Sequence, residues 1–296
     1  MPIRTVLALG VFLPAMVAAV VFALARSARG RAMPGAWGGA IALPAAFLLG
    51  RLSSTGWRWP SFPPTDSTDW LVYAAPVAGL LGLLAAVWEM PRAAAWVKRV
   101  AVSGALVALL VRPLAQHTWT PGHTVAWIAA ATIGIALLWW ALDIWTRKAP
   151  GPATAFWLLV IGSAGAGVLV FGHSARDGQS AGALTAGLGA AWVVSLLFRR
   201  RGVLARGAVP VLALLLPGLW LSGHLFASVS LVQIALLAVA PVLAALTTRG
   251  PLSRGPAGRV ALVRALAVLL PVCIAAGLAF QAWNAIAPGN YEEYGL

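Results

Sequence analysis

The chain has 296 residues, of which 61% are hydrophobic and 9% are charged, and its mean hydropathy is +0.88. This composition excludes a water-soluble protein of this length, because a soluble surface needs far more charge to cover it. The net charge of +14 does not predict nucleic-acid binding, because the basic residues lie in short segments between apolar stretches and no soluble domain presents them.

Long apolar stretches follow one another along the whole chain, and a helix of about twenty apolar residues crosses a hydrocarbon core of about 30 Å. In chain order they are residues 5–25, 33–50, 70–90, 100–116, 124–145, 154–172, 180–198, 207–224, 229–247 and 261–284. The sequence therefore predicts an all-α fold, a polytopic integral membrane helix bundle of about ten transmembrane helices, with residues 1–296 as a single transmembrane domain.

Two of these stretches need comment. Residues 5–25 are too long for the apolar region of a signal peptide, which has about 7–15 residues, so we expect a retained helix. Residues 33–50 form the weakest candidate because they are few and include Pro34 and Pro44, and nine helices would remain if this stretch does not cross.

Basic residues cluster in five segments that fall on one side of the membrane if every stretch crosses. These residues are Arg26, Arg29, Arg31, Arg92, Lys98, Arg99, Arg147, Lys148, Arg199, Arg200, Arg201, Arg206, Arg249, Arg254, Arg259 and Arg264. The positive-inside rule assigns that side to the cytoplasm, which predicts that both termini lie outside. Arginine greatly outnumbers lysine, as is typical of a GC-rich genome, so we expect a multi-pass protein of a bacterial inner membrane.

The predicted outer side carries polar and aromatic residues that membrane insertion does not require, and it includes the longest loop, residues 51–69. They form a candidate functional surface made of Trp57, Trp59, Asp66, Asp69, Arg112, His117, His123, His173, Asp177 and His224. We expect this loop to meet the outer ends of the fourth, sixth and eighth stretches, near three of the histidines. Asp66 or Ser67 is the expected N-cap of the third stretch. No catalytic, cofactor-binding or metal-ligating residue is assigned.

The outer segment His173-Ser174-Ala175-Arg176-Asp177 resembles the H-x-x-x-x-D motif of glycerolipid acyltransferases, with one residue fewer between His and Asp. The resemblance covers five residues and implies a histidine base that the aspartate orients. The alternative interpretation of the same segment is a polar turn between two helices.

Ionisable residues deep in a membrane mark functional sites, because they are costly there. The sequence places none at mid-membrane. Glu89 lies near Arg92, and Asp143 lies four residues before Arg147, so both acids are expected to form ion pairs near helix ends. Thr132, Ser195 and Gln233 are the most deeply placed polar residues. The absence of a mid-span acid argues against a proton or sodium antiporter.

Three functions stay open. Helix number, prolines within spans and a faint repeat, residues 33–150 against 154–251, favour a permease-like transporter of a small or apolar solute. The alternative is a non-catalytic membrane subunit of a larger complex, and the third reading is a membrane-embedded lipid-modifying enzyme. We expect the lipid bilayer as the partner, with other membrane subunits or a second copy of the chain as further partners, and no nucleic acid and no cofactor.

Overall fold

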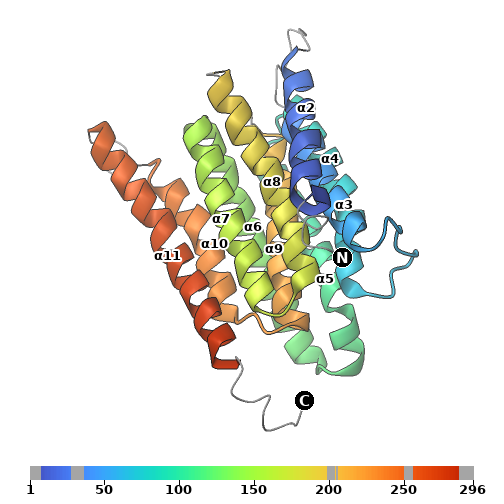
Figure 1. Cartoon of the computed structure of the whole chain (residues 1–296). Coiled ribbons are helices and arrows are strands. Elements are labelled where there is room, and N and C mark those ends of the chain that lie inside the picture. Colours follow the sequence, from blue (N-terminus) through green and yellow to red (C-terminus); the bar gives the residue numbers. More distant parts are fainter. Residues whose placement is uncertain (1–7, 28–36, 199–203, 205, 250–255, 287–296) are drawn as a thin grey trace.

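The structure is a computed structural model that describes residues 8–27, 37–198, 204, 206–249 and 256–286. Within these ranges it contains helices and no strands, so the predicted all-α fold class is confirmed (Figure 1). Two short turns accompany the helices, η1 (Ala8–Phe12) and η2 (Ser67–Asp69). The helices are α2 (Leu13–Ser27), α3 (Gly38–Ser54), α4 (Trp70–Val87), α5 (Arg92–His117), α6 (Pro121–Lys148), α7 (Pro152–Phe171), α8 (Ala175–Leu197), α9 (Ala208–Phe226), α10 (Leu231–Leu246) and α11 (Ala257–Ile286).

Eight helical segments of the described chain are long and apolar enough to cross a membrane. The other two apolar helices, α3 and α10, have 17 and 16 residues. Each apolar stretch of the sequence coincides with one of these helices, so the chain has the architecture of a multi-pass helical membrane protein. That α3 and α10 also cross, and the side on which each end lies, stay predictions.

Several helices extend beyond the apolar stretches that predicted them. α5 begins at Arg92 instead of residue 100, and α8 begins at Ala175 instead of residue 180. These extra turns are basic or polar, so hydropathy does not include them, although nothing in them interrupts a helix. Some predicted residues lie outside the described ranges: residues 5–7 and 33–36, and the basic residues Arg29, Arg31, Arg199, Arg200, Arg201 and Arg254.

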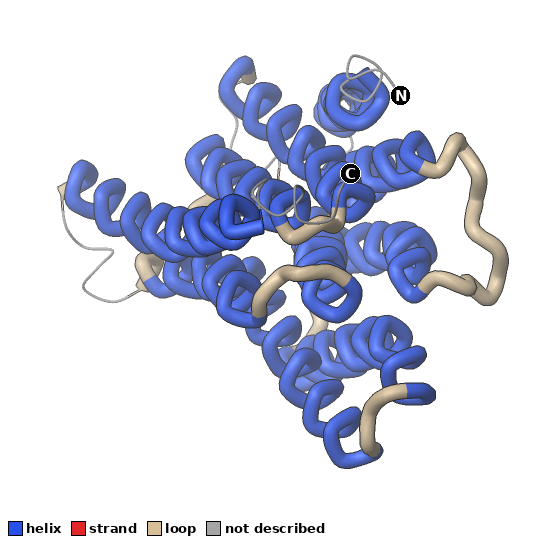
Figure 2. The backbone as a smooth tube through the Cα atoms, turned by 60° about the horizontal axis from the view of Figure 1, so that its bottom comes forward, coloured by secondary structure: helices blue, strands red, loops and turns tan. Residues whose placement is uncertain are grey.

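Helix α9 lies at the centre of the bundle, where every residue from position 208 to position 223 is buried. It packs against helices on several sides, chiefly α4, α6 and α3. Figure 2 shows the described chain as packed helices joined by loops. A helix buried all round has no face for lipid. Because α9 runs from one end of the bundle to the other, it links the two sites described below.

Glycines allow the closest helix contacts. A Cβ added at Gly162 of α7 would lie 2.6 Å from the Oγ1 atom of Thr185 on α8, and one at Gly50 of α3 would lie 2.2 Å from the Cβ atom of Ala183 on α8. Small residues at helix interfaces let backbones approach closely in membrane proteins. These glycines therefore let α3 and α7 pack closely on α8.

Helix α11 lies at the edge of the bundle, where it packs on α7 and α10 (Figure 1). Its outer face is an apolar stripe with a residue at every fourth position, Leu262, Leu266, Leu270, Ile274 and Leu278, all of them exposed. In a bilayer such a face contacts lipid or a partner helix.

The three deep polar residues have local roles. Gln233 forms a capping box with Ser230 at the start of α10, and the Ser195 hydroxyl donates to the carbonyl oxygen of Trp192. The Oγ1 atom of Thr132 is buried without a hydrogen-bond partner in the described chain. Gln233 therefore stabilises the start of α10.

Candidate functional site

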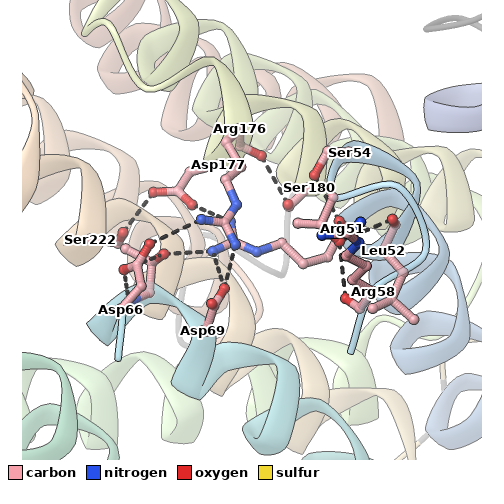
Figure 3. Close-up of polar contacts among 12 residues, drawn as sticks. Arg51, Leu52, Ser54, Arg58, Asp66, Asp69, Arg176, Asp177, Ser180 and Ser222 are labelled. Atoms are coloured by element: carbon pink, nitrogen blue, oxygen red, sulfur yellow. Dashed lines mark hydrogen bonds and ion pairs between the residues drawn. The ribbon is translucent and has the colours of Figure 1, made fainter. Parts of the chain in front are cut away.

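Arg51 is a buried charge in the last turn of α3, with 1% of its surface exposed. Its Nη1 atom donates to Oδ1 of Asp177 at 2.7 Å, and its Nη2 atom donates to Oγ1 of Thr68 at 2.5 Å and to Oδ1 of Asp69 at 3.1 Å (Figure 3). A buried charge is costly unless it is paired and hydrogen-bonded. These partners compensate the cost of burying a charged arginine in the last turn of α3.

Asp177, in the first turn of α8, joins three helices. Its Oδ2 atom accepts hydrogen bonds from the hydroxyls of Ser222 on α9 at 2.6 Å and of Ser174 at 3.0 Å, while Oδ1 accepts from Arg51 of α3. The residue is 4% exposed, and both carboxylate oxygens are satisfied. Asp177 therefore holds the ends of α3, α8 and α9 together.

Arg176 attaches the long loop to the start of α8. Its Nη1 atom donates to Oδ2 of Asp66 at 2.9 Å, and its Nη2 atom forms an ion pair with Asp69. Asp66 is the N-cap of η2, since its Oδ1 atom accepts from the Thr68 backbone N–H at 2.9 Å; it therefore caps the turn that leads into α4, while the N-cap residue of α4 itself is Asp69.

The carboxyl of Asp66 has a lowered pKa. Burial acts to raise this pKa, but the hydrogen bonds from the backbone and hydroxyl of Thr68 and the charges of Arg176 and Arg51 outweigh it. Asp66 therefore stays ionised in mildly acidic solution, and its contact with Arg176 persists there.

These side chains form one cluster, which we call the Arg51 network. It consists of Arg51, Asp66, Thr68, Asp69, Ser174, Arg176, Asp177 and Ser222. The network lies at the end of the bundle where α3 and α9 end and α4 and α8 begin, here called the network end. Each of its three carboxylates contacts a guanidinium group, so its chemistry suits a structural clamp better than proton transfer.

His173 does not pair with Asp177. The residue adopts φ 63° in the turn before α8, and its ring stacks on Trp283 of α11 with 5.1 Å between centroids. Asp177 is instead bonded to Arg51 and two serines. The His–Asp pair that the acyltransferase resemblance implies is therefore not formed.

His123 and His224 lie at the two ends of one row of aromatic rings, in which Trp119 stacks on Trp127 with 5.7 Å between centroids. His224 stacks on Trp127 with 5.3 Å between centroids, and its Nδ1 atom lies 2.8 Å from the carbonyl oxygen of Val229. His123 meets Trp119 edge to face. No group of three or more His, Cys, Asp or Glu side chains that could hold a metal ion occurs among the described residues.

The remaining residues of the candidate surface are exposed. His117 and Arg112 lie on the last turns of α5, and Trp57 and Trp59 lie in the loop. Trp59 packs edge to face on Tyr73 of α4, which draws the loop toward that helix. The structure thus brings three aspartates of the predicted surface into one network, while these four residues and the histidines lie outside it.

A basic pocket of about 540 Å³ lies at the opposite end of the bundle, here called the pocket end, between the ends of α4, α5, α6 and α9. Seven cationic side chains line it: Arg92, Lys98, Arg99, Arg147, Lys148, Arg206 and Arg249. Two acids, Glu89 and Asp143, and four tryptophans, Trp88, Trp96, Trp139 and Trp140, complete the polar and aromatic lining. Positive charge therefore dominates this pocket.

Both acids of the pocket are already paired. Asp143 forms an ion pair with Arg147 at 3.0 Å, as the spacing of four residues predicts. It also forms an ion pair with Arg99 of the neighbouring helix α5. Glu89 pairs with Arg206 rather than with the neighbouring Arg92, so the predicted partner of Glu89 was wrong. The nearest cation in the sequence is not the nearest in space, because Arg206, just before α9, lies beside the end of α4.

Tryptophan rings support three of the cations. Lys98 lies over Trp139 with 5.6 Å from Nζ to the ring centroid, and Arg249 lies over Trp140 at 5.2 Å. Arg99 lies over the ring of Trp96, also at 5.2 Å. Cation–π contacts of this kind hold a cation in place without neutralising it.

A second pocket, of about 570 Å³, lies between α6, α9 and α10 and is almost entirely apolar. Its walls include Trp127, Ile135, Leu221 and Ile234. Such a surface would accommodate an apolar solute or a lipid chain.

Comparison with protein-family models, with curated proteins and with solved structures finds no match to this chain. Its function must therefore be argued from its own residues. The sequence analysis missed Arg51, Arg176 and Ser222 as members of a site. Arg51 carried a signal, since it is a lone charge at the end of an apolar stretch and is followed by an acidic loop.

Proposed function

We propose that the chain is a permease-like transporter of a small solute in a bacterial inner membrane. In this proposal all ten helices α2 to α11 cross the bilayer and both termini lie outside. The basic residues gathered at the pocket end support the assignment of that end to the cytoplasm, because positive residues are retained there during insertion.

One observation carries the proposal: the two ends of the bundle are built differently. A pocket of about 540 Å³ opens at the pocket end, while the Arg51 network ties α3, α4, α8 and α9 together at the network end. A permease that works by alternating access opens its two ends in turn around a central site. In this proposal the structure represents the state that is open toward the cytoplasm.

The central helix supports coupling between the two ends. Pro210 of α9 lines the basic pocket, and Ser222 near the other end of the same helix belongs to the Arg51 network. Interior prolines occur in α9 and in five other helices, α3, α4, α5, α10 and α11. Proline removes a backbone hydrogen bond, and membrane helices bend at such points.

Cysteine labelling from each side of the membrane tests the proposal without knowledge of the solute. In a Cys273→Ser background, Ser180→Cys reports on the network end, because Ser180 is fully buried beneath Arg176, and Ala95→Cys reports on the basic pocket. A membrane-impermeant maleimide is applied to vesicles of each orientation, with and without Arg176→Gln.

Arg176→Gln removes two ion pairs at the network end. If the chain is a permease, Arg176→Gln should speed the labelling of position 180 from outside and slow the labelling of position 95 from the cytoplasm. Arg259→Gln, an exposed arginine of α11 that lines neither site, should change neither rate. Faster labelling at position 180 with an unchanged rate at position 95 would mean local loosening without coupling, and would refute the proposal.

The second candidate, a non-catalytic membrane subunit, is favoured by the exposed stripe on α11. A stripe with a residue at every fourth position suits packing against another transmembrane helix. Replacement of Leu266 and Leu270 by tryptophan should then release a partner during gentle purification, whereas a lipid-facing stripe would tolerate both changes with an unchanged native mass.

A further inference from the structure

We infer that the basic pocket binds a phosphate-bearing anion. Seven cationic side chains line the pocket and two carboxylates oppose them, so five positive charges are in excess. The carboxylates pair with Arg99, Arg147 and Arg206. The other four cations, Arg92, Lys98, Lys148 and Arg249, form no salt bridge in the described part of the chain, although the charge of Asp143 acts on Lys98 from a longer distance.

Membrane insertion does not explain why these four cations converge. They come from the start of α5, the end of α6 and the residues after α10, which meet at one cavity. Arg259 and Arg264 on α11 belong to the same predicted cytoplasmic side, and they meet the positive-inside rule without lining the cavity. Like charges gathered in one cavity repel each other, and a bound anion would relieve that repulsion.

The tryptophans favour a ligand over diffuse counterions. Cation–π contacts with Trp139 and Trp140 hold Lys98 and Arg249 against the pocket wall. The rings carry no net charge, so the positive charge of each side chain is not neutralised. Phosphate is an oxyanion that several cationic donors can bind at once, and a guanidinium group can donate two hydrogen bonds to two of its oxygen atoms.

The ligand has two possible sources that share this chemistry. One is the headgroup of an anionic phospholipid, since basic pockets between helices on the cytoplasmic side bind such headgroups. The other is a soluble phosphorylated solute, because a cavity of about 540 Å³ lies within the usual size of small-molecule sites, about 300–1,000 Å³. The site does not require transport, so its test is independent of the proposed function.

The test measures binding to the full chain in a neutral detergent. One arm titrates inorganic phosphate and glycerol 3-phosphate at constant ionic strength set by chloride, and the other adds short-chain phosphatidylglycerol or phosphatidylcholine. The readout is the midpoint of thermal unfolding, which rises with ligand concentration when a ligand binds the native state. A saturable rise with a phosphate compound that chloride does not reproduce supports the site. A rise with phosphatidylglycerol alone identifies the source as lipid.

Variants of residues that line the pocket test whether the anion binds there. Lys98→Gln with Arg249→Gln should raise the dissociation constant at least tenfold, because the double variant removes two charged hydrogen-bond donors to the anion. Arg259→Gln should leave it unchanged. Lys148→Gln, at an exposed position, replaces the double variant if that variant does not fold. The inference is wrong if no titration saturates in the unmodified chain, or if the pocket variants and Arg259→Gln bind equally well.

Discussion

Replacing Asp177 with asparagine removes the closest carboxylate of Arg51 and keeps the shape of the side chain. Arg51 is 1% exposed, and its Nη1 atom would lose the charged acceptor that now lies at 2.7 Å. Asp69 would remain at 3.1 Å from Nη2, but it also pairs with Arg176. The variant therefore leaves a buried charge that is only partly compensated.

Breaking a buried ion pair by removing one partner costs about 3–5 kcal/mol. We expect the lower end of that range, about 3 kcal/mol, because one carboxylate stays within hydrogen-bonding distance. The free energy of unfolding can be measured by titration with SDS in mixed micelles, followed by circular dichroism. Asp66→Asn is the matched control, since its pair with Arg176 is nearly half exposed and exposed pairs contribute about 0.2–1 kcal/mol.

The decisive comparison is between the two variants. If Asp177→Asn destabilises the protein no more than Asp66→Asn does, the Arg51 network is not a buried clamp. Ser222→Ala is a second test of the network. It removes one hydroxyl donor to Asp177 and should lower the free energy of unfolding by about 1 kcal/mol.

Three further predictions test packing, pH dependence and topology. Gly162→Ala should destabilise the bundle by about 1–3 kcal/mol in the same SDS titration, because its Cβ would lie 2.6 Å from a hydroxyl of α8, whereas Gly167→Ala, with open space around it, should have little effect. Because the pKa of Asp66 is lowered in the folded state, its ionised form stabilises the protein above the ordinary pKa of about 3.9, and this contribution is lost as pH falls through the lower folded value. The stability difference between the unmodified chain and Asp66→Asn should therefore be constant from pH 7 to pH 5 and vanish well below pH 4; a loss near pH 6 would contradict the lowered pKa. Reporter fusions after residues 95 and 148 should report the cytoplasm, and fusions after residues 60 and 176 the opposite side; a cytoplasmic signal at residue 176 would overturn the assigned orientation.

The sequence predicts the features of this protein that depend on neighbouring residues. Long apolar stretches predict helices because the backbone in lipid must satisfy its own hydrogen bonds. The cap at Asp66 and the pair between Asp143 and Arg147 follow from spacings of two and four residues. Each of these interactions forms within one turn or one helix.

The contacts that build both sites join residues far apart in the chain. Arg51 and Asp177 are 126 residues apart, and Glu89 pairs with Arg206 through the approach of two separate helix ends. Such contacts depend on the order of helices in the bundle, which hydropathy does not encode. For the same reason the sequence predicts that the four histidines share one side, but not that His123 and His224 meet one pair of stacked tryptophans while His173 stacks on Trp283.

If the chain is the proposed permease, the two ends of its bundle open in alternation. Electron paramagnetic resonance can measure distances between α5 and α8 at both ends, with spin labels at Gln116 and Ala175 for the network end and at Val97 and Leu196 for the pocket end; all four positions are exposed. In nanodiscs, Arg176→Gln should lengthen the distance at the network end and shorten the distance at the pocket end. A longer distance at the network end with an unchanged distribution at the pocket end would contradict the claim.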